Sequence, residues 1–235
     1  MPGLEVILLP GTLMPPSCFD AVALPGGATA RVVDWMDAVR PCGLEATTAH
    51  VAAQLKPATP TIMVGHSTGG AIAALAALNR PDLVAGLVLI NSGPNMVGHG
   101  AVGGMLERLT GPTDDAMWDG FARKNVPAGS PAEWIRAMVE YSRRIGGAQA
   151  AAILADQAAT NLLDRSPLPD LPVEVVHGAL DTKRSIDDAR AWSRVFPAAR
   201  LTVFENCGHT PPLERPDDVA AAIDRVARRI SAAGR

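Results

Sequence analysis

A serine with a glycine two residues away on each side is the strongest chemical signal in the sequence. Gly65, Ser67 and Gly69 form the pattern G-x-S-x-G, which is typical of a nucleophile elbow, a sharp strand-to-helix turn that exposes a serine hydroxyl. Glycine is needed at both flanks because side chains there would collide as strand and helix approach each other. An apolar stretch precedes the turn and a Gly/Ala-rich stretch follows it. This context predicts a nucleophile at the N-terminus of a helix.

A serine hydroxyl attacks efficiently only when a base removes its proton and a third group orients that base. Of the five histidines, His209 suits the role of base best, because it lies between the last predicted strand and the last predicted helix. Asp181 suits the role of orienting acid, since it follows a buried strand and a glycine. Asp34, at the end of the second predicted strand, is the alternative acid.

The other four histidines have mostly structural explanations. His66 lies within the elbow, where its side chain must point away from the serine. His50 lies on an amphipathic helix and should be half exposed, and His177 belongs to a strand end. His99 stands at the start of a glycine-rich segment and is a candidate for contact with substrate.

Strands and helices alternate through most of the chain. A nearly continuous apolar run predicts a buried strand at 4–9, and short stretches rich in apolar residues predict further strands at 30–34, 61–65, 87–90, 173–177 and 200–204. Amphipathic helices are expected at 44–56, at 186–196 after a capping Ser185, and from Pro216 onward. This alternation predicts a doubly wound, mostly parallel α/β sheet with right-handed crossovers. Ligands bind beyond the carboxyl ends of such strands, so the serine and the two partner loops should meet at one edge.

Residues 93–168 interrupt this order. The segment holds four candidate helices, one of them introduced by a capping box at Ser130–Glu133 with proline at its first position. It also contains half of the eight methionines and two of the four tryptophans. An adaptable apolar surface of this kind suits a lid over a substrate pocket. The residues expected to line that pocket are Met96, Met105, Trp134 and Met138. The alternative is that the stripe of Trp134, Met138 and Tyr141 only packs the segment onto the body.

Composition limits the other function classes. A chain of 235 residues can form one large domain without disulfides or a structural metal. The net charge of −3 and the scattered basic residues exclude a nucleic-acid-binding stripe. No segment is long and apolar enough for a membrane span. We therefore expect a cytoplasmic protein with a small-molecule partner and neither metal nor cofactor; the sequence does not indicate its oligomeric state.

Three cysteines, an odd number without metal-ligand spacing, are expected to be free thiols in a reducing compartment. They are Cys18, Cys42 and Cys207. Cys207 lies two residues before His209, yet no neighbouring charge would activate it, so a packing role is favoured.

Three sequence blocks together resemble the α/β-hydrolase superfamily, in particular its lid-bearing esterase, lactonase and C–C hydrolase branch. The blocks are residues 64–70 (VGHSTGG), 176–181 (VHGALD) and 207–216 (CGHTPPLERP), and the resemblance covers essentially the whole chain. It implies a single domain over 1–235 with a helical lid at about 93–168. It also implies Ser67 as nucleophile, Asp181 as acid and His209 as base, which is the chain order of that family's triad.

Two departures from the family pattern concern the start of the chain. Where the family has His-Gly before its oxyanion loop, this sequence has Pro10-Gly11. The oxyanion donors implied are the backbone N–H groups of Thr68 and Thr12. Leu13 is an alternative donor and a candidate for the pocket wall. The chain also begins at what resembles the family's third strand, so about six strands are expected, without the usual N-terminal edge strands.

The predicted activity is hydrolysis of a small or medium carboxylic ester, or of a lactone, through an acyl-enzyme. A thioesterase or a C–C bond hydrolase would use the same residues. A perhydrolase or a lyase on the same scaffold is a further alternative. An alternative from another class is a ligand receptor or signalling protein that keeps the triad and turns over slowly.

Overall fold

The computed structural model describes residues 3–97 and 102–233. Its six strands form one parallel sheet in the order β2-β1-β3-β4-β5-β6, which confirms the predicted doubly wound fold. The strands are β1 (Glu5–Leu9), β2 (Thr29–Val32), β3 (Thr61–His66), β4 (Gly86–Ile90), β5 (Val173–Gly178) and β6 (Ala199–Phe204).

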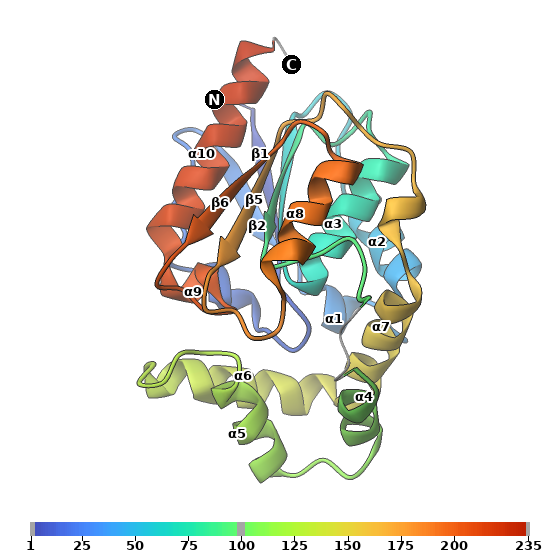
Figure 1. The fold of residues 1–235 in the computed structure, drawn as a ribbon, viewed down its shortest axis with the longest axis vertical. Coiled ribbons are helices and arrows are strands. Elements are labelled where there is room, and N and C mark those ends of the chain that lie inside the picture. Colours follow the sequence, from blue (N-terminus) through green and yellow to red (C-terminus); the bar gives the residue numbers. More distant parts are fainter. Residues whose placement is uncertain (1–2, 98–101, 234–235) are drawn as a thin grey trace.

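Helices cover both faces of this sheet (Figure 1). On one face α10 packs against β3, β4 and β5, and on the other α3 and α8 contact the strands while α2 packs on α3. The helices are α1 (Trp35–Ala38), α2 (Leu44–Ala52), α3 (Thr68–Asn79), α4 (Val102–Thr110), α5 (Asp115–Arg123), α6 (Ala132–Ile145), α7 (Gly147–Ala159), α8 (Ile186–Val195), α9 (Pro211–Glu214) and α10 (Pro216–Ala232), with short 3-10 turns η1 (Pro16–Phe19) and η2 (Leu162–Asp164).

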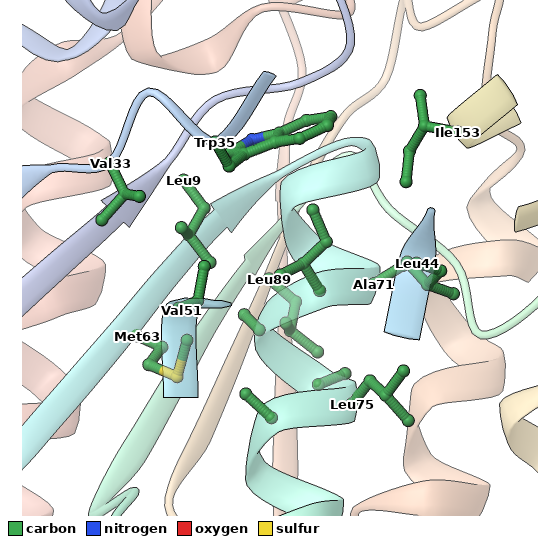
Figure 2. Packing of buried hydrophobic residues seen from close by; sticks show 14 of the residues in the cluster. Leu9, Val33, Trp35, Leu44, Val51, Met63, Ala71, Leu75, Leu89 and Ile153 are labelled. Atoms are coloured by element: carbon green, nitrogen blue, oxygen red, sulfur yellow. The ribbon is translucent and has the colours of Figure 1, made fainter. Parts of the chain in front are cut away.

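The continuous apolar strands are explained by burial on both faces. Successive side chains of a strand point to opposite sides, so Ile7 and Leu9 join the hydrophobic cluster around α2 and α3. Val6 and Leu8 join a second cluster under α10. Figure 2 shows the first cluster. Each aliphatic side chain buried this way contributes about 1.5–3 kcal/mol, which holds the central strands rigid beneath the elbow.

The segment between β4 and β5 forms four helices, α4 to α7, as predicted. In Figure 1 the strand arrows point toward α4, α5 and α6, which therefore lie beyond the carboxyl ends of the strands. No helix within 3–97 and 102–233 is long and apolar enough to cross a bilayer.

The two predicted capping signals have different outcomes. Ser185 forms a full capping box with Asp188 at the start of α8. The capping box predicted at Ser130 is wrong, because Pro131 with ψ 135° is itself the residue before α6 and no side chain caps that helix. The extended ψ of Pro131 leaves the serine one residue too far from the first turn.

Candidate active site

Ser67 stands at the junction of β3 and α3 in a strained conformation. Its φ of 52° and ψ of −117° lie outside the regions favoured by non-glycine residues, at a cost of about 1–3 kcal/mol. Its N–H donates to the carbonyl of Ile90 at 2.8 Å, and its own carbonyl accepts from Gly70 N at 3.0 Å. These bonds hold the turn that the sequence pattern predicts.

Both glycines of the pattern are required by close backbone contacts. A Cβ added at Gly65 would lie 2.2 Å from the carbonyl oxygen of Gly69. A Cβ added at Gly69 would lie 2.1 Å from the carbonyl oxygen of Leu9 in β1. The elbow therefore closes only with glycine at these two positions.

Asp181 and His209 come together from neighbouring strand ends. Nδ1 of His209 lies 2.9 Å from Oδ2 of Asp181, and the Asp181 side chain is completely buried. Burial alone would raise the pKa of Asp181, but hydrogen bonds from His209 and from the N–H groups of Lys183 and Arg184 lower this pKa to about 2. The carboxylate is therefore ionised and able to orient the imidazole.

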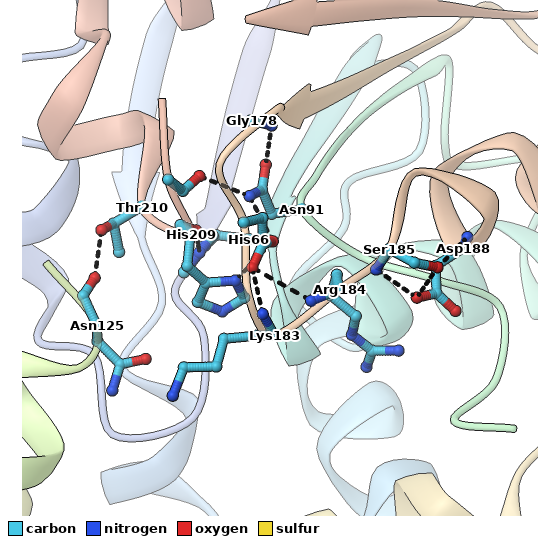
Figure 3. A network of polar contacts seen from close by, with 12 residues as sticks. His66, Asn91, Asn125, Gly178, Lys183, Arg184, Ser185, Asp188, His209 and Thr210 are labelled. Atoms are coloured by element: carbon cyan, nitrogen blue, oxygen red, sulfur yellow. Dashed lines mark hydrogen bonds and ion pairs between the residues drawn. The ribbon is translucent and has the colours of Figure 1, made fainter. Parts of the chain in front are cut away.

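Asn91 is a further part of this arrangement that the sequence analysis missed. Its amide nitrogen donates to Oδ2 of Asp181 at 2.6 Å and to the carbonyl of Gly208 at 2.9 Å. Its amide oxygen accepts from Gly178 N at 3.0 Å. Asn91 thus links the loops of the acid and the histidine (Figure 3). The available signal was a polar residue directly after a buried strand.

The alternative acid, Asp34, lies elsewhere. Its carboxylate accepts hydrogen bonds from the Tyr141 hydroxyl and, at 3.1 Å, from Arg144. Both partners belong to α6, so Asp34 fastens that helix to the end of β2. The geometry favours Asp181 over Asp34 as the partner of His209.

Ser67 and His209 both line one cavity of about 990 Å³. Among the described residues no hydrogen bond joins Ser67 Oγ to His209. Such contacts are often long without substrate and tighten when it binds. The cavity therefore contains a strained serine and an acid-oriented histidine on a shared wall.

The other predicted pocket residues divide into two groups. Thr12, Leu13, Met96 and Met105 line the cavity. Trp134 and Met138 do not line it, because they pack on the hydrophobic cluster beneath α10. Met138 is only 1% exposed. The stripe on α6 therefore attaches this helix to the body, as the packing alternative stated.

Hydrogen bonds between side chains join the two segments that are expected to supply the oxyanion hole. Thr12 Oγ1 lies 2.8 Å from Thr68 Oγ1, which in turn donates to Gln157 Oε1 at 2.9 Å. The N–H of Leu13 points to the sulfur of Met36 at 3.1 Å. Gln157, on α7, is a second residue that the sequence analysis missed, since nothing in its local sequence marks it.

Three further histidines agree with their structural explanations. His66 is buried, and its Nε2 lies 2.7 Å from the carbonyl of His209. Burial and the nearby His209 lower the pKa of His66 to about 3. His177 is buried and His50 is half-buried. His99 lies outside the described residues.

The three cysteines are free and buried. Burial and the adjacent Glu214 raise the pKa of Cys207 to about 12, so its thiol is not activated. In the parts of the chain that the structure describes, no group of three or more His, Cys, Asp or Glu side chains could hold a metal ion.

The buried His66 predicts a pH-dependent stability. Because its pKa falls to about 3 in the folded state while the unfolded chain takes up a proton near 6.5, stability should decline as pH falls below about 6.5. From this group alone, the free energy of unfolding should be lower by roughly 2 kcal/mol at about pH 5 than near neutral pH. Thermal unfolding of His66→Asn should show a smaller loss of stability between about pH 7 and pH 5 than the wild type. The matched control, His50→Asn, should retain the wild-type pH dependence; equal slopes in all three proteins would contradict this assignment.

Comparison with known proteins shows the family to which this fold belongs. The family model for the alpha/beta hydrolase family matches residues 6–222. The pimeloyl-(acyl-carrier protein) methyl ester esterase of Aromatoleum aromaticum is 31% identical over 186 residues, covering 71% of this chain and 74% of that protein. Among solved structures, the enol-lactonase from Burkholderia xenovorans LB400 superposes with a TM-score of 0.83 at 16% identity, over 95% of this chain and 91% of that one. An esterase from Exiguobacterium antarcticum gives a TM-score of 0.76 at 17% identity, over 96% and 92%. The chain therefore belongs to the α/β-hydrolase family.

Proposed function

We propose that this protein hydrolyses a carboxylic ester of small or medium size, or a lactone, through an acyl-enzyme on Ser67. The observation that carries the proposal is the shared cavity, which Ser67 lines together with the His209–Asp181 pair. The relative from Aromatoleum aromaticum is named as a methyl ester esterase, which agrees with ester chemistry.

In the proposed reaction Ser67 Oγ attacks the ester carbonyl while His209 Nε2 removes its proton. Asp181, held by Asn91, keeps the imidazole in the required tautomer through Nδ1. His209 then returns the proton to the leaving alcohol, and a water molecule activated by the same histidine releases the acid from Ser67.

The oxyanion would be held by the backbone N–H groups of Thr68 and Thr12. Thr68 is the first residue of α3, so its N–H has no partner within the helix. Thr12 is preferred to Leu13, because the Leu13 N–H is already directed to Met36. The bonds from Thr12 through Thr68 to Gln157 would position the loop in place of the histidine that the family usually has there.

The helices α4 to α7 would act as a lid that sets substrate choice. Met96 and Met105 belong to the segment between β4 and β5, and both line the cavity. Methionine side chains adapt to different acyl groups, so the length of the acyl chain accepted should depend on them.

Labelling with a phosphonylating reagent tests the nucleophile. One residue per chain should react and peptide mapping should place it at Ser67, because this serine stands at the strained elbow and lines the cavity together with His209. Ser67→Ala should abolish labelling and lower turnover by ~10⁶. Ser193→Ala, on an exposed surface of α8, is the control and should change neither. Labelling followed by a single burst without turnover on every ester would favour the receptor alternative; absence of labelling in folded protein would exclude both.

A pair of aspartate variants tests the acid. Asp181→Asn should keep the fold and lower kcat by ~10⁴, since the amide stabilises the wrong imidazole tautomer. Asp34→Asn should leave kcat close to the wild-type value, because its partners are on α6. Circular dichroism checks the fold of both variants, and steady-state kinetics on one ester ranks their loss of kcat. A larger loss in Asp34→Asn than in Asp181→Asn would show that the acid has been assigned to the wrong strand end.

A pair of methionine variants tests the lid. Met105→Ala should shift the acyl-length preference measured as kcat/KM over a series of esters, because it enlarges the cavity. Met138→Ala should lower Tm, since it removes a buried side chain, without altering the length preference. An unchanged profile for Met105→Ala would show that this part of the segment does not contact the acyl chain.

A further inference from the structure

The cavity is positively charged although the chain as a whole is negative. The net charge of the chain is −3. Among the described residues that line the cavity are four cationic side chains, on Arg108, Lys124, Lys183 and Arg184, and two acidic ones, on Asp181 and Asp188. The chain has only three lysines, at 56, 124 and 183, and two of them line this cavity.

Among the described residues, neither acid forms an ion pair with these lysines. Asp181 accepts hydrogen bonds from His209, Asn91 and two backbone N–H groups. Asp188 caps α8 through Ser185 and lies within the electrostatic range of Arg184. Within 3–97 and 102–233, none of Arg108, Lys124 and Lys183 forms an ion pair with a carboxylate.

The three cations come from separate elements and influence one another. Arg108 belongs to α4, Lys124 follows α5, and Lys183 lies in the loop after β5. The pKa of Lys183 is lowered by burial and by the positive charges of Lys124 and Arg108, which together outweigh the opposite effect of the Asp181 carboxylate. Figure 3 shows the Lys183 side chain leaving the loop that holds Asp181 and extending toward Asn125.

Bringing like charges together costs free energy, and a half-buried lysine costs more because it has lost part of its hydration. An anion bound between the three side chains would reverse both costs. Lysine and arginine are also the side chains that bind carboxylates and phosphates through charge-assisted hydrogen bonds. The arrangement therefore suits an anionic group placed at some distance from the scissile carbonyl.

We propose that Lys183, Lys124 and Arg108 form an anion subsite, and that the substrate is a small ester carrying a carboxylate or a phosphate on the part remote from the reacting carbonyl. This proposal rests on the proposed ester hydrolysis. The subsite would orient the ester toward Ser67 and steer anionic molecules into the cavity.

Kinetics with matched esters test the substrate class. Monomethyl adipate carries a free carboxylate, whereas dimethyl adipate and methyl hexanoate do not. The wild type should show a kcat/KM for monomethyl adipate, or for a methyl ester ending in a phosphate, that exceeds the value for the neutral esters by ~10- to 100-fold, the range expected for charged hydrogen bonds. Whichever anion gives the larger ratio identifies the group. Added salt should reduce the ratio.

Lysine variants assign the effect to the subsite. Lys183→Met and Lys124→Met should each lower the ratio of anionic to neutral kcat/KM, and the double variant should bring it close to one. Lys56→Met, which removes the remaining lysine outside the cavity, should retain the wild-type ratio. A ratio near one in the wild type, or an equal loss on both substrate types in the lysine variants, would overturn the subsite.

Binding without turnover separates this proposal from the proposed activity. Calorimetry with Ser67→Ala should show adipate binding that Lys183→Met weakens by ~10-fold or more. If no ester is hydrolysed by the wild type but adipate binds in this manner, the activity is wrong and the subsite stands. If esters are hydrolysed and adipate binding is insensitive to the lysines, the subsite is wrong and the activity stands.

Discussion

The close backbone contact between β1, β3 and α3 is the constraint on which the rest of the site depends. The Gly69 backbone approaches the Leu9 carbonyl so closely that no side chain fits between them, and this contact forces Ser67 into its strained conformation. Strain of this size persists only where the surroundings leave no alternative. Here the surroundings are α3, which is almost entirely buried, and the two hydrophobic clusters that fix the central strands.

A second set of bonds transfers this rigidity to the acid and the histidine. Asn91 follows β4, the neighbour of the elbow strand, and its amide contacts Asp181 and the backbone beside His209. His66, in the elbow itself, also contacts the carbonyl of His209. Because these bonds join the ends of β3 and β4 to the loops that follow β5 and β6 at one edge of the sheet, they fix the position of His209 relative to the elbow that carries Ser67. The side chains of Asn91 and His66 thus hold His209 in the position where its imidazole can take up a proton.

The sequence predicted what depends on local pattern or on backbone geometry. All six strands and the elbow were recognised: burial on both faces leaves largely apolar stretches in the four central strands, the regular alternation with helices marks the edge strands β2 and β6, and close contacts at the elbow admit only glycine. The pairing of Asp181 with His209 was also expected from their strand-end positions. Asn91 and Gln157 were missed, since they act on residues 90 and 89 positions away in the chain, and no local pattern records such a contact. Met138 was misplaced for a related reason, because helical spacing shows that a face is apolar but not which surface covers it.

The helices α4, α5 and α6 beyond the strand ends differ in role: one is attached to the body, and the other two contribute to the cavity. The sequence alone did not separate these roles. One face of α6 is fastened to the body through Tyr141, Arg144 and Asp34, which restricts its movement. By contrast, α4 and the residue after α5 place Arg108 and Lys124 on the cavity wall, where neither forms an ion pair with a described carboxylate. A segment that served only to cover apolar substrate would gain nothing from unpaired cations, because they cost hydration free energy on closing. The proposed anion subsite accounts for their position through the charge of the substrate rather than through the fold, because a fold shared by many activities leaves substrate choice to the residues of the site.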